Sequence, residues 1–316
     1  MCLVLGECDE KKKKIERVSV RCFNPKANLF FNILIAIFAL SCVIPFIFVI
    51  IISLTDESYL INHGYSFFPK IWSIHAYHYI FKGVMAEKII RSFGISVFIT
   101  VFGTFINTTM TSTYAYAISR PYFPYKRFFT VYALITMLFA PGMVANYLVV
   151  SNLLQLKDTI WALILPLALG PFGILVMRTF FKKTVPDSII ESARIDGASE
   201  LTIFLKIVLP LAVPGIATIS LFAALSYWND WFNALLYIQS DNLVPMQYLL
   251  MKVQSNLEAL ARNASLGAQM ADGFKALPKE SVRMAIVVIA TLPIAITYPF
   301  FQKYFVGGLT IGGVKE

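Results

Sequence analysis

Six long apolar blocks constrain this 316-residue chain more than any other feature, because a surface that faces water cannot accommodate them. The first block covers residues 29–52 and would measure about 36 Å as a helix, enough to cross a hydrocarbon core of roughly 30 Å. The other blocks are 89–118, 128–150, 160–180, 209–238 and 284–301. Only 14% of the residues are charged, against about a quarter in soluble domains. The sequence therefore predicts an all-α, polytopic membrane protein with six transmembrane helices.

The distribution of basic residues predicts the orientation of these helices. Six spans place both ends on one side of the membrane, and 17 of the 27 lysines and arginines flank the spans on that side. Because basic residues collect on the cytoplasmic side, the N and C termini are expected to be cytoplasmic. This gives a cytoplasmic N-terminal segment (1–28) and a transmembrane domain (29–316), with extracellular loops at 53–88 and 239–283 and one long cytoplasmic loop at 181–208.

Several other classes of site are disfavoured. The four cysteines all fall within the first 42 residues without metal-type or redox-type spacing, so they are interpreted as free thiols. The three histidines lie in the first outer loop with no carboxylate or thiol at a matching offset, and no metal site is predicted. No nucleophile, base and acid arrangement is recognisable, so no catalytic residue is predicted.

The cytoplasmic loop carries a fixed pattern of residues. It contains Glu191-Ser192-Ala193, then Gly197, then Ile207 and Leu209-Pro210. This spacing resembles the EAA signature of the permease subunits of binding-protein-dependent ABC importers, which is E-A-A, three residues, G, nine residues and I-x-L-P. The one departure is Ser192. The resemblance implies the type I ABC importer permease fold in a bacterial cell membrane.

Local sequence signals also favour a helix, a turn and a second helix in this loop. Asp187 or Ser188 can cap the first helix, Gly197 ends or bends it, and the second helix leads from about Ala198 to Pro210. An ordinary amphipathic helix at the membrane surface is the alternative. The resemblance implies instead that the loop couples to a separate ATPase subunit through Glu191, Ser192, Ala193, Asp196, Gly197, Ala198, Ile207, Leu209 and Pro210.

The chain itself is predicted not to be an enzyme. Its closest approach to a phosphate-binding loop, at 307–315, lacks the lysine offset and the hydroxyl that such a loop requires. No cofactor is therefore expected in this chain, and the resemblance implies ATP and Mg on a partner ATPase. The expected partners are a second, different permease, two ATPase subunits, a solute-binding protein outside the cell and membrane lipid, with no nucleic acid.

The end of the fifth block and the C-terminal segment resemble the carbohydrate branch of this family, the maltose-type second permease and its relatives for complex oligosaccharides. A sugar site needs aromatic planes with amide or carboxylate partners. The predicted substrate-path residues are Tyr227, Trp228, Asn229, Asp230, Trp231 and Asn233, with Asn146 and Tyr147 in the third block. An interfacial aromatic belt and packing between subunits remain open for the same residues.

The expected function is thus the transmembrane permease of an ATP-driven importer that moves a sugar, expected to be an oligosaccharide, into the cytoplasm. An ion-coupled secondary transporter is the alternative from another class. Such a protein usually carries ionisable side chains deep within its spans. The middle sections of all six blocks lack them.

The two ends of the chain carry further predictions. The basic N-terminal segment is expected to lie near anionic lipid headgroups. The glycine-rich tail after Phe305 is open to two interpretations, a contact with the ATPase or a solvated terminus.

Overall fold

The computed structural model describes residues 25–82, 86–139, 141–262 and 280–311. Within these ranges the regular structure is helical, apart from one isolated antiparallel bridge between Thr55 and Trp72. The all-α prediction is confirmed. The first three cysteines, the basic N-terminal run and residues 312–316 of the tail lie outside the described residues, whereas Cys42 is a free, exposed thiol.

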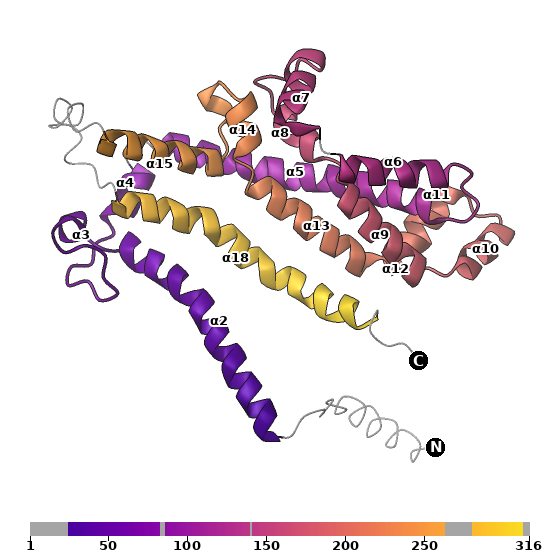
Figure 1. Ribbon diagram of the computed structural model, residues 1–316, viewed down its shortest axis with the longest axis horizontal. Coiled ribbons are helices and arrows are strands. Elements are labelled where there is room, and N and C mark those ends of the chain that lie inside the picture. Colours follow the sequence, from indigo (N-terminus) through magenta and orange to yellow (C-terminus); the bar gives the residue numbers. More distant parts are fainter. Residues whose placement is uncertain (1–24, 83–85, 140, 263–279, 312–316) are drawn as a thin grey trace. The chain divides into compact units, whose positions relative to one another are not determined.

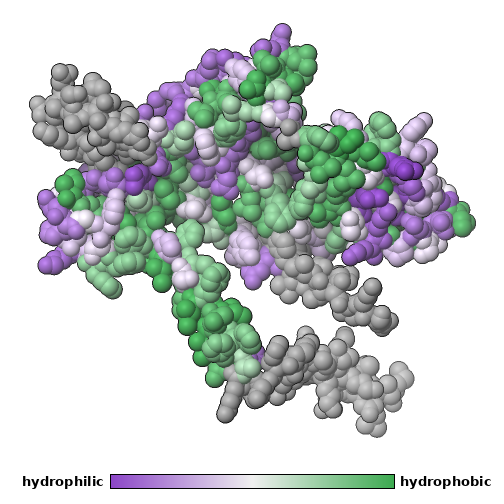
Figure 2. Space-filling model, in the orientation of Figure 1, coloured by the Kyte–Doolittle hydropathy of each residue, from purple (hydrophilic) through white to green (hydrophobic). Residues whose placement is uncertain are grey.

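The chain divides into two compact units, residues 1–51 and 52–316. The first unit contains nearly all of α2 (Pro25–Ser53), a helix that continues through Pro45. A proline inside a helix removes one backbone hydrogen bond, which membrane helices tolerate. In Figure 2, hydrophobic residues cover this helix.

The second unit contains the remaining elements (Figure 1). Its first half comprises α3 (Glu57–His63), α4 (His75–Lys82), α5 (Ala86–Ser119), α6 (Lys126–Leu138), α7 (Gly142–Leu148), the π-helical turn η1 (Val149–Leu153), α8 (Trp161–Ile164), η2 (Leu165–Leu167) and α9 (Pro171–Thr184). Its second half comprises α10 (Asp187–Ile195), α11 (Glu200–Ile203), η3 (Phe204–Val208), α12 (Leu209–Leu211), α13 (Val213–Trp228), α14 (Phe232–Tyr237), η4 (Asp241–Leu243), α15 (Met246–Arg262) and α18 (Glu280–Ile311).

The predicted six spans are present as three continuous helices and three bent pairs. The continuous ones, α2, α5 and the first part of α18, are each long and apolar enough to cross a membrane. The bent pairs are α6 with α7–η1, α8–η2 with α9, and α11–η3–α12 with α13, the last two bent by 49° and 82°. Counting each bent pair as one span gives the six-span architecture.

The fifth block differs from the single helix that the sequence pattern favoured. The chain turns at Ala212, α13 starts at Val213, and the helix ends at Trp228 before the short α14. Pro210 and Pro214 explain the break, because proline lacks a backbone N–H and fixes φ. Asp230 therefore lies after the end of α13 and not on one straight helix that begins near Pro210.

The long helix α5 organises the second unit, with α13 and α9 as its main neighbours. Two close approaches fix this packing. An added Cβ at Gly103 in α5 would lie 2.6 Å from the Tyr227 ring, and one at Gly215 in α13 would lie 2.6 Å from the Phe180 ring. Only glycine fits where a ring lies this close to the backbone.

Candidate functional site

The loop between α9 and α13 folds as a helix, a glycine turn and a second helix. Gly197 has φ +80°, its N–H donates to the carbonyl of Arg194 (3.0 Å), and the N–H of Ala198 donates to the carbonyl of Ala193 (3.0 Å). These two bonds form a Schellman motif, which ends a helix with a left-handed residue. Ser199 then caps α11 by accepting the backbone N–H three residues later (3.3 Å). The turn is therefore specified residue by residue.

One side of α10 packs on the rest of the unit. Ile190 is fully buried and Ala193 nearly so, in an apolar cluster with Phe181 of α9 and Phe204 of η3. The other side is open, and the Ile195 side chain at the end of the helix is 86% exposed. The exposed apolar side chains around this turn, Ile189, Ile195, Leu201 and Leu205, form a surface that we call the loop tip. Exposed aliphatic side chains next to charged residues are typical of a protein contact surface.

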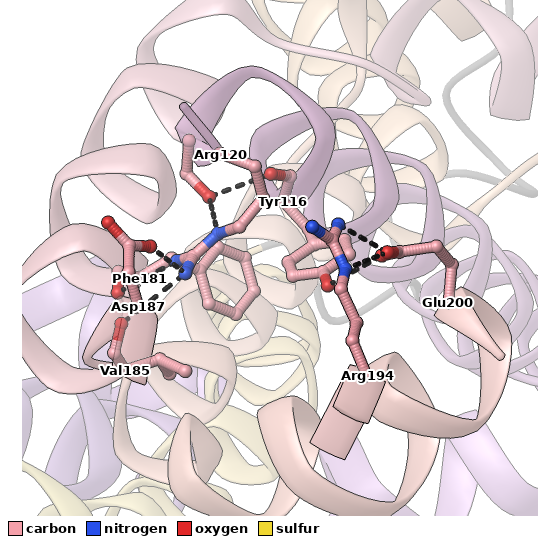
Figure 3. Close-up of polar contacts among 8 residues, drawn as sticks. Tyr116, Arg120, Phe181, Val185, Asp187, Arg194 and Glu200 are labelled. Carbon is pink, nitrogen blue, oxygen red and sulfur yellow. Dashed lines mark hydrogen bonds and ion pairs between the residues drawn. The ribbon is translucent and has the colours of Figure 1, made fainter. Parts of the chain in front are cut away.

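Arg120 anchors the start of this loop from the end of α5 (Figure 3). Its side chain is only 4% exposed. The guanidinium donates to Ser119 Oγ (2.9 Å), to the carbonyl oxygens of Phe181 (3.2 Å) and Val185 (3.4 Å), and to Asp187 Oδ1 (2.9 Å). A buried cation needs such a full set of acceptors. Arg120 thus joins the ends of α5 and α9 to the first turn of α10.

A second polar cluster bridges the glycine turn. Arg194 Nε donates to Glu200 Oε1 (2.7 Å), so that an ion pair joins α10 to α11 across Gly197. The guanidinium lies 3.7 Å from the centre of the Tyr122 ring. Tyr116 donates to Glu200 Oε2 (3.3 Å), and Figure 3 draws Tyr116, Arg194 and Glu200 of this cluster. Cation–π and ion-pair contacts at one arginine hold both helices in a fixed relation.

The charge of Glu200 favours the protonated form of Arg194. Partial burial acts to lower the pKa of Arg194, but the hydrogen bond and the negative charge of Glu200 outweigh it and raise that pKa. Burial raises the pKa of the Tyr122 hydroxyl. Arg194 is therefore charged at neutral pH, while Tyr122 stays neutral.

The structure brings together most of the residues predicted to couple to an ATPase. Glu191 and Asp196 are exposed, Ser192 donates to the carbonyl of Ser188 (2.9 Å), and Ala193 packs inward. Gly197 and Ala198 form the turn. Ile207, Leu209 and Pro210 lie apart from it, in η3 and α12, where the chain bends toward α13.

The predicted substrate-path residues in and after α13 divide into two groups. Tyr227 and Trp228 are buried and donate to the carbonyl oxygens of Ile164 and Ala290 (2.9 Å each), and both therefore pack helices together within this chain. Asn229, Asp230 and Trp231 form the connection to α14, and Asn233 is the second residue of that helix. There Asn229 and Trp231 are exposed, and Asp230 accepts bonds from the backbone and the amide of Asn233 (3.1 and 2.8 Å).

The pair predicted in the third span is in α7. Asn146 is exposed, and the Tyr147 ring stacks on Tyr237 of α14, with centroids 5.9 Å apart. This stacking contact links the third span to the end of the fifth. Among the residues that the structure describes, no group of three or more His, Cys, Asp or Glu could hold a metal ion.

Comparison with known proteins decides the family. No family model matches the chain. The chain is 40% identical over 273 residues to Protein LplC of Bacillus subtilis (strain 168), which covers 86% of this chain and 89% of LplC. It is 39% identical over 292 residues to the polygalacturonan/rhamnogalacturonan transport system permease protein YtcP of the same organism, covering 91% and 99%. This chain belongs to the family of sugar ABC transporter permeases.

A solved structure agrees with that membership. A crystal structure of a bacterial ABC transporter involved in the import of the acidic polysaccharide alginate has a chain that superposes with a TM-score of 0.76 at 30% identity, covering 90% of this chain and 99% of that one. The permease is therefore a bacterial membrane protein that does not itself hydrolyse ATP, since a separate subunit does so in this family. This excludes the alternative of an ion-coupled secondary transporter.

Sequence reasoning missed the residues that position the loop of this permease. Arg120 contributed only to the count of cytoplasmic charges, and Tyr116, Tyr122 and Glu200 were not singled out. Their partners lie 61 to 84 residues away or across a turn, and no local sequence pattern indicates such pairs. One signal was available, because Arg120 directly precedes Pro121 at the end of a span, and an acidic residue, Asp187, lies at the start of the first helix predicted in the cytoplasmic loop.

Proposed function

We propose that this permease imports an oligosaccharide bearing carboxylate groups, which an extracellular solute-binding protein delivers and ATP hydrolysis on separate subunits drives. The names of two similar proteins support the charge of the substrate, since alginate is described as acidic and galacturonan is by its chemical name a polymer of a uronic acid. The proposed complex contains a second, different permease and two ATPase subunits that bind ATP and Mg. In the proposed topology both termini are cytoplasmic.

The fold of the loop between α9 and α13 is the observation that supports coupling to a separate ATPase in this proposal. A loop that couples ATP hydrolysis to the membrane helices must transmit movement without changing its own shape. This loop is held in shape by a buried arginine, an ion pair and a Schellman turn. Its tip nevertheless presents Ile195 and Leu201 to the outside. In the proposed mechanism the tip lies in a groove of the ATPase subunit, with Glu191 reaching a basic residue there.

Movement of the loop would reach the spans through two connections. Arg120 ties α10 to the end of α5, and η3 and α12 lead through the bend at Ala212 into α13. ATP binding would bring the ATPase subunits together and move this loop, together with the corresponding loop of the second permease. The packed helices would then tilt and open toward the binding protein. Hydrolysis would restore the first arrangement.

The substrate path remains part of the proposal. The exposed Asn229 and Trp231 are the candidates for direct sugar contact, because an aromatic face and an amide suit a ring with hydroxyl groups. Asn233 and Asp230 would fix the conformation of that segment, and Asn146 and Tyr147 would complete the path from the third span. Tyr227 and Trp228 would hold the surrounding helices.

Reconstitution of the whole complex in proteoliposomes tests the function. Uptake of a labelled oligogalacturonate should require ATP inside, together with the binding protein outside. Uptake that proceeds on a proton gradient without ATP, or no uptake of any oligosaccharide by a complex that hydrolyses ATP, would refute the proposal.

A further inference from the structure

The first turns of α5 lie at the end of that helix far from α10 (Figure 1). A polar cavity is lined in part by these turns. Its volume is about 390 Å³. The lining comes from the first turns of α5, from η4 and the residue after it, and from α15. Its exposed or partly exposed polar residues are Lys88, Asp241, Lys252 and Asn256, and its apolar residues are Val244, Leu249 and Val253. Ligand pockets in proteins start at about 300 Å³.

Two lysines in this cavity share a single carboxylate. Lys88 Nζ lies 2.9 Å from Asp241 Oδ2, and Lys252 Nζ lies 3.8 Å from Asp241 Oδ1. The hydrogen bond and charge of Lys88 hold the pKa of Asp241 below its usual value, so this carboxylate is ionised at neutral pH. Nearby Arg91 adds a third cation, which donates to Asn242 of the same turn and to Glu87.

The arrangement is poorly suited to a purely structural role. All three side chains of the lysine–carboxylate group are between 38% and 65% exposed, and ion pairs this exposed stabilise a fold very little. The carboxylate also sits on η4, a turn of three residues. Its ammonium partners come from two different helices. The cluster thus resembles a binding site for a carboxylate that is filled by one from the chain itself.

We propose that this cavity is a subsite for a uronate carboxylate of the incoming oligosaccharide, and that Asp241 occupies its lysines until the uronate displaces it. Lys88 and Lys252 would pair with the uronate, Asn256 would bond a ring hydroxyl, and the valines and leucine would contact the C–H face of the sugar. This inference rests on the proposed function. It adds the location, at the proposed extracellular end of α5, where substrate would first meet the permease.

Uptake kinetics of the reconstituted complex test the subsite, with trigalacturonate and its fully methyl-esterified form as probes. Lys88→Gln and Lys252→Gln should each raise the KM for trigalacturonate about two- to fivefold, the effect of losing one exposed ion pair. Neither variant should alter the KM for the uncharged ester. Asp241→Asn should lower the KM for trigalacturonate, because it removes the competing carboxylate. Lys70→Gln, at an exposed lysine outside the cavity, is the matched control.

The response of Asp241→Asn separates the subsite from its alternatives. If the three residues merely clamp the fold, Asp241→Asn will impair uptake as the lysine variants do. If the lysines instead bind the solute-binding protein, the lysine variants will raise the KM for both probes equally. Either result overturns the inference, as does wild-type KM in both lysine variants. If the complex transports neutral oligosaccharides only, the inference and the proposed charge of the substrate both fail, while ATP-driven import stands. No ATP-driven uptake at all would refute the import function itself.

Equilibrium dialysis of labelled trigalacturonate against the purified permease–ATPase complex, without binding protein, gives an independent readout. The wild-type complex should bind the label, and Asp241→Asn should bind it more tightly. The lysine variants should bind it more weakly. Equal binding by all variants would overturn the inference.

Discussion

Replacement of Arg120 tests how rigidly the loop must be held. Arg120→Ala removes the charge-assisted hydrogen bonds to the carbonyls of Phe181 and Val185 and to Asp187. The Phe181 carbonyl keeps the N–H of Val185 (3.0 Å), and the Asp187 side chain is 53% exposed and regains water. Because these groups are partly compensated, we expect a cost of about 3 kcal/mol rather than the sum of all the bonds. Asp187→Asn should cost less than about 1 kcal/mol, since it weakens only the half-exposed partner.

The assay compares the variants in the assembled complex. Arg120→Ala should insert and assemble, but lose most of the ATPase stimulation by loaded binding protein, together with uptake. Arg120→Lys should be intermediate, because a single ammonium cannot reach three acceptors on two elements. Asp187→Asn should stay close to wild type. Normal coupling in Arg120→Ala, or a defect in Asp187→Asn as severe as in Arg120→Ala, would refute the reasoning that the buried guanidinium holds α10.

Three further predictions concern the glycine turn, the helix packing and the loop between η1 and α8. Gly197→Leu should uncouple ATP hydrolysis from uptake while Gly197→Asn retains more activity, because φ is +80° there and asparagine tolerates this region; equal activity in both would contradict the prediction. Gly103→Ala should lower the free energy of unfolding by about 1–3 kcal/mol, since its Cβ would lie 2.6 Å from the Tyr227 ring. Gly94→Ala should leave that free energy unchanged, because the space around its Cβ is open. The backbone N–H groups of Ser240 and Gln239 hold the pKa of Asp158 below its usual 3.8, so the stability that its charge provides is present above pH 3.8 and is lost as pH falls through the folded-state value. The difference in melting temperature between wild type and Asp158→Asn should therefore shrink as pH falls below 3.8, and a constant difference would refute it.

The parts of the fold that local chemistry dictates could be predicted from the sequence. Long apolar runs require membrane helices, because a backbone in lipid must satisfy its own hydrogen bonds. Gly197 ends α10 as its φ requires, and the proline-rich stretch around Pro210 marks the bend before α13. The motif spacing located the loop, and comparison with relatives confirmed the family.

The remaining features depend on contacts between distant parts of the chain. Tyr227 and Trp228 satisfy the aromatic pattern of a sugar site, yet within this chain they bond the carbonyls of Ile164 and Ala290. The sequence does not distinguish an aromatic residue near the end of a span that packs against neighbouring helices from one that binds a sugar. The role of Arg120 was hidden for the same reason, because the sequence does not show which carbonyl oxygens converge on its guanidinium.

Site-specific photocrosslinking at the loop tip tests the central claim most directly. A photoreactive residue in place of Ile195, 86% exposed beside the glycine turn, should form an adduct with the ATPase subunit in the assembled complex. The same residue in place of Phe68, 88% exposed in the loop between α3 and α4, should not. Failure of the Ile195 probe to label the ATPase in a complex that transports, or labelling of that subunit from position 68, would contradict the assignment of α10 and its turn as the coupling element.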